Sequence, residues 1–563
     1  MKDRKTLDQI LFEKSKITED QLSEVKRAHK KNDKEIRELV VERKFASEKE
    51  VSEALSEEIG IPFIDLENYI IDPSVTGIIG EKKARQMNVM PLYVVKDILT
   101  VAMADPQDIV ARDEVKIVSK FDKVEVLMAT KTALMTAIDQ NYNLGDSLED
   151  ILRPMETEGM VYAPSAAVTP HMLANLAGQP PVVKFVNQMI FDALRKRASD
   201  IHVEPTHDKV KVRFRIDGVL HNITSIPRDI NLPIVPRLKI LAGLDIAERR
   251  KPQDGRFTVN LSGRYIDLRV AAFPIAYGET ITLRLLDKAT AMLDLEELGL
   301  VKGDFDKFKK IIKSPYGIVF VTGPTGSGKT TTLYSILNQI SSSEKNIVTI
   351  EDPIEYLLDN VNQAQVNTKI GLDFAAAIRS FLRQDPDVIL VGEVRDPNTA
   401  EMALRSSLTG HLVFSTLHTN DAPRSIARLR DLGVDRKMLA SAIICVLAQR
   451  LVRIICPSCK VEEKPDKALL EELGVKVEGG MKFYTGKGCD DCSHTGYSGR
   501  IGIFELLEFN DEVRELVFND VSMDEVVKIA VKAGMRTLRE DGLEKVKAGI
   551  TSLSEVVRVT KKE

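Results

Sequence analysis

The chain has 563 residues, 43% of them hydrophobic and 29% charged, which is ordinary for a soluble globular protein. This length exceeds what one core supports, so we expect about three or four domains. The net charge of -5, the absence of Trp and an aromatic content of 5% argue against nucleic acid as a partner. No apolar run reaches the roughly eighteen residues of a membrane span, and the charged N-terminus does not read as a signal peptide. Five cysteines favour a reducing compartment, so we expect a cytoplasmic protein.

The first sixty residues contain a weak internal repeat, in which Leu7 aligns with Ile36 at an offset of 29. Each copy has a short apolar segment followed by a capping-box signal, Thr18-x-x-Gln21 or Ser47-x-x-Glu50. Each box predicts the start of an amphipathic helix. A plain helical pair and a functional repeat are equally compatible with this pattern. A small mixed unit with a strand at 98–103 follows and closes near residue 142.

A change in composition separates this N-terminal part from the next domain. Residues 143–180 have no clear period and are rich in small residues and prolines near their end, which predicts a flexible linker with at most one short helix. A helix is expected at 182–197. Strands are then expected at 210–216, 265–270 and 280–286, with Asp217-Gly218 as a hairpin turn. The pattern predicts a separate α+β domain before the alternating strands and helices that begin near residue 298.

The most specific signal is Gly323-Pro-Thr-Gly-Ser-Gly-Lys-Thr330, a complete G-x-x-x-x-G-K-[ST] motif. It follows the apolar run 318–321 and precedes a predicted helix, which is the context of a P-loop. Its backbone N–H groups would surround phosphate oxygens, Lys329 would reach the β- and γ-phosphates, and Thr330 would hold Mg²⁺. The alternative is a glycine-rich turn that binds nothing. The predicted phosphate-binding residues are Gly323, Pro324, Thr325, Gly326, Ser327, Gly328, Lys329, Thr330 and Thr331.

Three further predicted strands end in polar side chains. The strand at 346–350 leads to Glu351, the strand at 388–391 leads to Glu393, and the strand at 411–416 leads to His418. Because ligands bind at the carboxyl ends of parallel strands, we expect these side chains near the P-loop. Glu393 takes the position of a Walker B acid on Mg²⁺, and His418 could contact the γ-phosphate. Each residue alone would more often be a helix cap or a surface group.

Arginines mark the predicted strands of the preceding domain. Arg269 and Arg284 lie fifteen residues apart on adjacent strands, and Arg213 and Arg215 share another strand. They are either ordinary surface ion-pair partners, worth about 0–1 kcal/mol each, or arginine fingers for an ATP site. The sequence leaves open whether such a finger acts in cis or in trans.

Four cysteines form two pairs, Cys456-Pro-Ser-Cys459 and Cys489-Asp-Asp-Cys492. Four thiolates in two such pairs suit a tetrahedral, structural Zn²⁺ site, and four unligated thiols are the alternative. His494 lies beside the second pair and could compete as a ligand. The remaining cysteine, Cys445, falls in an apolar stretch at 439–447 that we interpret as a helix, which predicts a buried packing residue.

The combination of these motifs resembles the secretion ATPase superfamily of type IV pilus and type II secretion systems. The resemblance covers the chain from about residue 180 to the C-terminus. Beyond the P-loop, it rests on the stretches Ala198-Ser-Asp-Ile-His-Val-Glu-Pro205, Leu244-Asp-Ile-Ala-Glu-Arg-Arg-Lys-Pro-Gln-Asp-Gly255, Ile350-Glu-Asp-Pro-Ile-Glu355, Gly392-Glu-Val-Arg-Asp396 and Thr409-Gly-His-Leu-Val-Phe-Ser-Thr-Leu-His-Thr-Asn420.

This resemblance implies an α/β protein with a RecA-like P-loop ATPase core, a PAS-like α+β domain before it (N2), a mainly helical N-terminal domain (N1) and a zinc knuckle held by four cysteines. The resemblance also implies a homohexamer that binds ATP between N2 and the core. The expected boundaries are 1–142 for N1, 143–180 for the linker, 181–297 for N2 and 298–563 for the ATPase domain, with the knuckle at 456–492 and a helical tail at 511–563.

The resemblance also implies roles for single residues. Glu351 is the expected general base for the attacking water, Glu393 the Walker B acid and His418 the residue near the γ-phosphate. Arg269 and Arg284 match paired N2 arginines that complete the site. The remaining expected nucleotide contacts are Arg213, Arg215 and Arg500.

The N-terminal extension and the cysteine pairs favour a pilus extension motor acting on an inner-membrane platform protein, located in the cytoplasm at the inner membrane. Accessory proteins are possible partners of N1. A type II secretion ATPase is the main alternative, and a RecA-like nucleic-acid translocase is a weaker one. Relatives that bind cyclic di-GMP start each repeat with R-L-G, whereas this chain has Thr6-Leu7-Asp8 and Glu35-Ile36-Arg37, so we do not expect tight binding.

Overall fold

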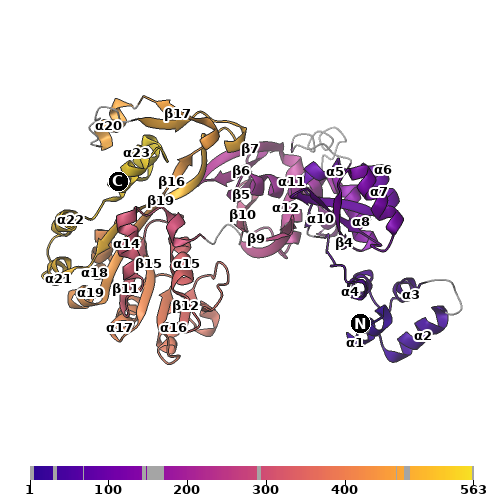
Figure 1. The fold of residues 1–563 in the computed structure, drawn as a ribbon, viewed down its shortest axis with the longest axis horizontal. Helices are drawn as coiled ribbons and strands as arrows, with labels where there is room; N and C mark the ends of the chain where they lie inside the picture. The colour runs from indigo at the N-terminus through magenta and orange to yellow at the C-terminus, as the bar shows by residue number, and fades with distance from the viewer. Residues whose placement is uncertain are drawn as a thin grey trace. The chain divides into compact units, whose positions relative to one another are not determined.

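The computed structural model describes residues 5–29, 35–67, 69–142, 148, 170–287, 293–464, 466–473 and 482–560. The chain forms two compact units, a first unit of Met1–Asp287 and a second unit of Lys288–Glu563. Figure 1 shows the first unit in indigo to magenta and the second in red to yellow.

Four helices open the first unit, and their boundaries follow the sequence repeat. They are α1 Leu7–Glu13, α2 Glu19–His29, α3 Ile36–Glu42 and α4 Glu48–Ile59. An offset of 29 carries the start of α1 onto α3 and that of α2 onto α4. Both predicted capping boxes form, since Thr18 N–H donates to Gln21 Oε1 at 2.8 Å and Ser47 accepts from the Glu50 N–H. The prediction of paired amphipathic helices is therefore confirmed.

A small α/β layer follows the four helices. Its strands, in the order β2-β3-β4, are β2 Val89–Val95, β3 Ile98–Met103 and β4 Lys123–Met128. Its helices are α5 Pro73–Thr76, α6 Glu81–Met87, α7 Ile109–Ser119 and α8 Lys131–Asn141. The predicted strand at 98–103 is β3 in full. Buried Met90, Leu99 and Ile138 belong to the core that joins this sheet to its helices.

A seven-stranded sheet with the order β1-β8-β9-β10-β5-β6-β7 completes the first unit. Its strands are β1 Tyr69–Ile70, β5 Ala198–Pro205, β6 Lys209–Ile216, β7 Val219–Pro227, β8 Gln253–Leu261, β9 Arg264–Ile275 and β10 Gly278–Asp287. The accompanying helices are α10 Pro170–Ala177, α11 Pro180–Arg195 and α12 Arg228–Leu241. Phe185 of α11 and Phe214 of β6 share one core, so α11 covers one face of the sheet and leaves the other polar.

Two details of this sheet bear on the sequence predictions. Asp217 and Gly218 have φ of 49° and 84°, which is the geometry of the predicted β6–β7 hairpin turn. Strand β1, within the segment predicted as N1, pairs in parallel with β8 of the predicted N2 domain. Helix α10 and the start of α11 fall inside the predicted linker, most of which lies outside the described residues.

The second unit is built on a sheet with the order β13-β12-β14-β15-β11-β16-β19. Its strands are β11 Gly317–Thr322, β12 Ile347–Glu351, β13 Asn362–Gln365, β14 Val388–Val391, β15 Leu412–Leu417, β16 Ile443–Ile455 and β19 Tyr497–Glu508. All neighbours are parallel except β16 and β19. Because β15 separates β11 from β14, the P-loop strand and the Glu393 strand flank the His418 strand, as in RecA-like cores.

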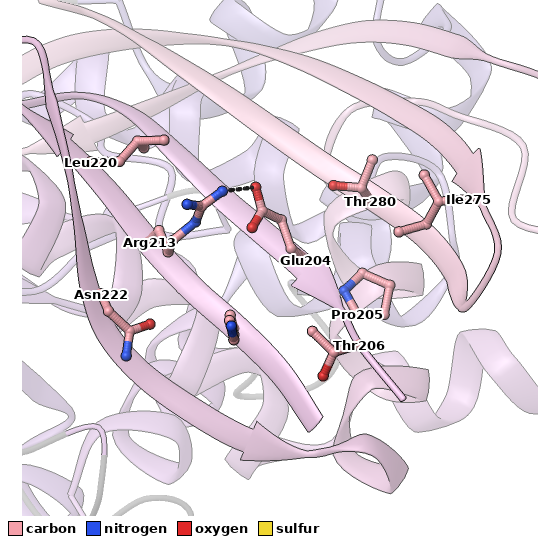
Figure 2. Close-up of a pocket in the computed structure, with 9 residues that line it drawn as sticks. Glu204, Pro205, Thr206, Arg213, Leu220, Asn222, Ile275 and Thr280 are labelled. Carbon is pink, nitrogen blue, oxygen red and sulfur yellow. Dashed lines mark hydrogen bonds and ion pairs between the residues drawn. The ribbon is translucent and has the colours of Figure 1, made fainter. Parts of the chain in front are cut away.

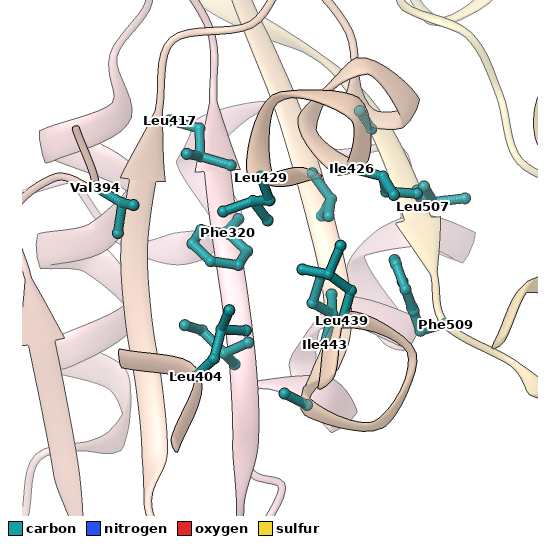
Figure 3. Packing of buried hydrophobic residues seen from close by; sticks show 14 of the residues in the cluster. Phe320, Val394, Leu404, Leu417, Ile426, Leu429, Leu439, Ile443, Leu507 and Phe509 are labelled. Carbon is teal, nitrogen blue, oxygen red and sulfur yellow. The ribbon is translucent and has the colours of Figure 1, made fainter. Parts of the chain in front are cut away.

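Helices cover both faces of this sheet. They are α14 Lys302–Ile311, α15 Lys329–Ile340, α16 Phe374–Phe381, α17 Pro397–Leu408, α18 Ala422–Asp431 and α19 Arg436–Ala442, with short 3-10 helices η1 Leu295–Leu298 and η2 Thr368–Ile370. Figure 3 shows Phe320 of β11 packed among Leu404, Leu429 and Leu439 from the helices of one face. Leu337 of α15 belongs to the core on the opposite face.

The prediction of a helix at 439–447 is wrong for the second half of this segment. Helix α19 ends at Ala442, and Cys445 lies in β16 between β11 and β19. The hydrophobic pattern of a short apolar run fits both a buried helix and a central strand. Here the segment is a strand because it pairs with a neighbouring strand on each side. Cys445 is fully buried, as predicted.

The cysteine region extends from the β16–β19 end of the sheet, and a helical tail follows it. The cysteine region contains η3 Pro457–Cys459, β17 Lys460–Glu463, α20 Lys467–Leu473, β18 Phe483–Gly486 and η4 Asp490–Cys492. The tail contains α21 Asp511–Phe518, α22 Met523–Lys532, α23 Leu538–Lys547 and α24 Leu553–Thr560. Among the described residues, no helix combines the length and apolarity needed to cross a bilayer.

Candidate nucleotide site

The P-loop connects β11 to α15, and its glycines are required by its geometry. Gly328 has a φ of 90°, in the left-handed region that favours glycine. A Cβ at Gly323 would lie 2.4 Å from the Gln449 carbonyl oxygen, and one at Gly328 would lie 2.7 Å from Gln449 Nε2. Side chains at these positions would therefore push the loop off β16.

Two polar side chains of the loop fit a phosphate group. Lys329 Nζ donates to the carbonyls of Gly323 at 2.7 Å and Pro324 at 3.1 Å, so it lies over the loop. Burial lowers the pKa of Lys329 to about 8, against an opposing effect of Glu393. Ser327 Oγ is buried and has no hydrogen-bond partner among the described residues. An anion bound in the loop would stabilise both groups, because it would accept a hydrogen bond from the buried hydroxyl and would pair with the partly desolvated ammonium.

Glu393 and His418 meet beside Lys329. Glu393 follows β14, and one of its oxygens lies 3.4 Å from His418 Nε2 while the other lies 2.6 Å from Arg395 Nη2. Burial and the charge of Lys329 lower the pKa of His418, so its imidazole is neutral at pH 7. The N–H of Thr419 donates to Thr322 Oγ1 at 3.0 Å, which ties the histidine loop to the end of β11.

Glu351 ends β12 and is only 4% exposed. Its carboxylate accepts hydrogen bonds from the Tyr334 hydroxyl, from Thr349 Oγ1 at 2.6 Å and from Gln363 Nε2 at 3.1 Å. The Gly392 N–H donates to the Ile350 carbonyl at 2.8 Å, so the backbones next to Glu351 and Glu393 are in contact. Three donors fix one orientation of the Glu351 carboxylate.

The structure adds residues to this site that sequence reasoning missed. They are Tyr334, Gln363, Arg395 and Gln449, each of which touches a predicted residue or the loop. Arg395 lies two residues after Glu393, so proximity in sequence was an available signal. Tyr334, Gln363 and Gln449 reach the site from other elements, and no local pattern indicates them.

The predicted arginines of the first unit all lie on the polar face of its sheet. Arg269 and Arg284 are directly paired across β9 and β10. Arg284 Nε donates to Asp200 Oδ1 at 3.0 Å, and Arg215 Nε lies 3.5 Å from Asp200 Oδ2. Arg213 pairs with Glu204 at 2.6 Å. Asp200 and Glu204 were not predicted, although both belong to the matched stretch at 198–205.

Arg213 also lines a pocket of about 770 Å³ on this face, shown in Figure 2. Its Arg213–Glu204 ion pair lies between Leu220 and Asn222 on one side and Thr280 on the other. The pocket is formed by the first unit alone. Arg500, the remaining predicted contact, is in the second unit, where β19 places it opposite Arg453 of β16.

The four paired cysteines converge at one point. Sγ–Sγ distances are 3.8 Å for Cys456–Cys489, 3.9 Å for Cys459–Cys492 and 3.7 Å for Cys489–Cys492. A tetrahedron with Zn–S bonds of about 2.3 Å has sulfur atoms about 3.8 Å apart, so the donor set fits Zn²⁺. His494 is outside this group and lies 3.2 Å from Asp490 instead.

Comparisons with known proteins identify the family of the chain. The family described as "Type II/IV secretion system protein" matches residues 175–558, and the "MshEN domain" matches residues 59–148. The chain is 41% identical to the type IV pilus assembly ATPase PilB of Myxococcus xanthus over 556 residues, covering 98% of each chain. It is 46% identical to the type II secretion system ATPase E of Vibrio cholerae over 381 residues, covering 68% of this chain and 76% of that one.

One solved structure supports the fold. The ATPase DotB of Legionella pneumophila superimposes with a TM-score of 0.50 at 24% identity, covering 67% of this chain and 95% of that one.

Proposed function

This chain belongs to the type II/IV secretion system protein family, and from that premise we propose that it is a hexameric motor that hydrolyses ATP to drive type IV pilus assembly. The observation that carries the proposal is the meeting of Lys329, Glu393 and His418 at the ends of three neighbouring strands. Such a set serves phosphoryl transfer, in which positioning and charge stabilisation provide most of the catalysis.

Each residue has one task in this proposal. Lys329 and the loop N–H groups bind the β- and γ-phosphates. The buried Ser327 hydroxyl, which has no hydrogen-bond partner among the described residues, donates to a phosphate oxygen as well. Thr330 and Glu393 hold Mg²⁺, which neutralises charge on the phosphate oxygens when bound. Glu351 orients the attacking water and takes its proton, because its three donors keep the carboxylate in one position. His418, neutral at pH 7, donates toward the γ-phosphate.

Arginines of the first unit are proposed as further phosphate contacts. Arg269 and Arg284 stabilise negative charge on the phosphates, and arginines in this role are worth about 10³–10⁵ in rate. Asp200, which accepts from Arg284, limits where that guanidinium lies. Arg213, Arg215 and Arg500 are further contacts in the same proposal. Zn²⁺ in the cysteine site is structural, since four protein ligands leave no open position.

The partner would be an inner-membrane platform protein, with the hexamer on its cytoplasmic side and accessory proteins at the N-terminal domain. The pilus relative supports this choice over export, since it covers 98% of this chain at 41% identity, whereas a type II secretion relative from Xanthomonas campestris covers 92% at 39% identity. A type II secretion motor is the second candidate, because a secretion relative is 46% identical over 381 residues.

ATP turnover by the full-length protein tests the first part of the proposal. Lys329→Ala should lower kcat by about 10²–10³, the typical cost of removing one preorganised charge-stabilising group. Lys313→Ala, an exposed lysine before β11, is the matched control and should keep normal turnover. Normal turnover of the Lys329 variant would refute the assignment of the site.

Deletion of the gene in the organism that encodes it tests the second part. Loss of surface pili with normal protein secretion supports the pilus motor. Loss of secretion with normal pili would transfer the proposal to the type II system.

A further inference from the structure

The second unit contains a buried carboxylate that the proposed chemistry does not use. Glu505 of β19 is 5% exposed, and its two oxygens accept hydrogen bonds from the starts of two helices. Its Oε1 accepts from the N–H of Ala422, the first residue of α18, at 2.8 Å. Its Oε2 accepts from the N–H of Leu538, the first residue of α23, at 3.3 Å. One side chain therefore joins two helix N-termini, whose partial positive charge stabilises a carboxylate.

The sheet register places Glu505 in line with the end of the P-loop strand. Glu505 is opposite Ala448 of β16, and Ala448 is opposite Thr322 of β11. Side chains alternate between the faces of a sheet, so Glu505 is on the face of Ile503 and Thr322 is on the face of Phe320. Ile503 and Phe320 belong to one core, which also contains buried residues of α18. Glu505 and Thr322 therefore face the same side of the sheet, where α18 packs.

The loop between β15 and α18 carries His418 and is held at both of its ends. Thr322 Oγ1 lies 2.7 Å from Thr419 Oγ1 and accepts from the Thr419 N–H, which fixes the residue directly after His418. Glu505 holds the other end of the loop through the Ala422 N–H, four residues after His418. The path of this short loop therefore depends on Glu505 as well as on the end of β11.

We propose that Glu505 is a positioning residue of the ATPase reaction, which holds the start of α18 and thereby the loop that carries His418. The proposal rests on the proposed function, in which His418 donates toward the γ-phosphate. A carboxylate suits this task because it accepts from both N–H groups at once, and hydrogen bonds to an ionised acceptor are the stronger kind. A glutamine has one acceptor oxygen in place of two, so it replaces only one of these bonds.

The surroundings of Glu505 make its charge depend on pH near neutrality. Burial raises the pKa of Glu505 to about 7, the nearby charges of Asp421 and Glu540 act in the same direction, and the two N–H donors oppose them. Arg450 of β16 is on the same face of the sheet and donates to Asn420 Oδ1 at 2.9 Å. As pH falls through 7, the carboxylate takes up a proton and one of its oxygens no longer accepts a hydrogen bond.

The test compares Glu505→Gln, Glu505→Asp, His418→Ala and the double variant Glu505→Gln/His418→Ala in the full-length protein. At pH 8, Glu505→Gln should lower kcat about 10-fold, the lower end of what one hydrogen bond to a charged group is worth. Affinity for ADP should stay the same, because ADP lacks the γ-phosphate. Glu505→Asp keeps the charge and should recover part of the kcat. Glu508→Gln, at an exposed glutamate of the same strand, is the matched control and should leave kcat and Tm unchanged.

The double variant shows whether Glu505 acts through His418. Once the imidazole is removed, Glu505→Gln should cause little further loss, because coupled residues are not additive. Additive losses would overturn the proposal. Unchanged kcat in Glu505→Gln together with a loss in His418→Ala would also overturn it and leave the proposed function standing. Unchanged kcat in His418→Ala would refute the histidine part of the proposed function and this proposal with it.

The pH profile separates positioning from a purely structural role. The ratio of wild-type kcat to Glu505→Gln kcat should rise from about 1 at pH 6, where most of the wild-type carboxylate is protonated, to about 10 at pH 8. A ratio that does not change with pH, together with a lowered Tm, would assign Glu505 a structural role and overturn the proposal. If Glu505→Gln is unfolded at the assay temperature, the comparison with His418→Ala is made with Glu505→Asp, whose loss must disappear in the same way.

Discussion

Replacing Tyr334 by phenylalanine would test how Glu351 is held for catalysis. Tyr334 is 2% exposed, and its hydroxyl donates to the Glu351 carboxylate. The same oxygen accepts from the Glu355 N–H at 3.3 Å and from Gln363 Nε2 at 3.4 Å. The ring itself packs edge-on against Tyr356, with centroids 4.5 Å apart, and phenylalanine preserves that contact.

The size of the effect follows from these bonds. A hydrogen bond to a charged group is worth about 1.5–3 kcal/mol and a neutral one about 1 kcal/mol. Since the two neutral bonds are long, we expect a loss of about 3 kcal/mol of stability. For a unit of this size that corresponds to a fall in Tm of roughly 6–12 °C. In the variant, Glu351 keeps two hydrogen-bond donors but is held less firmly. We therefore expect kcat to fall about 10- to 100-fold, which is part of the rate enhancement that a positioned general base usually provides.

The assay is steady-state ATP hydrolysis below the melting temperature of the variant, with KM measured alongside kcat. KM should change little, because Tyr334 contacts Glu351 and not the P-loop lysine. Tyr316→Phe, at a tyrosine that is 59% exposed, is the matched control and should leave kcat and Tm unchanged. A kcat within twofold of the wild type in Tyr334→Phe, together with inactivity of Glu351→Gln, would refute the idea that Tyr334 orients Glu351.

Three other predictions concern charge and metal. Because burial lowers the pKa of Lys329 to about 8, the free protein loses this charge as pH rises through 8, and affinity for Mg-ADP should then fall by up to ~10-fold per pH unit. Calorimetry from pH 7 to 9.5 measures this, and a flat profile contradicts it. Cys459→Ser should abolish bound zinc, because the site has four ligands and its binding energy is coupled to folding. Metal analysis checks this prediction, and undiminished zinc would disprove it. Asp200→Asn leaves Arg215 and Arg284 without their shared acid, so stability should fall by about 1–3 kcal/mol, and by more at low salt. Urea unfolding at two salt concentrations tests this, and equal losses would count against it.

The sequence by itself determined what depends on neighbours along the chain. The strand and helix on either side of the P-loop motif, the capping boxes at Thr18 and Ser47 and the Asp217-Gly218 turn were predicted correctly, because each is set by residues within a few positions. The cysteine spacing likewise predicted the cluster that the structure brings together.

Tertiary structure alone decided the contacts made across elements. Tyr334 meets Glu351 because α15 and β12 contribute to one buried core, and Cys445 lies in a strand because partners pair with it on both sides. Glu505 stands in line with Thr322 only through the register of β19, β16 and β11. Shifting that register by one residue would turn the Glu505 side chain to the other face, and the register is set by the buried faces of the sheet as a whole. No local stretch of sequence contains that information.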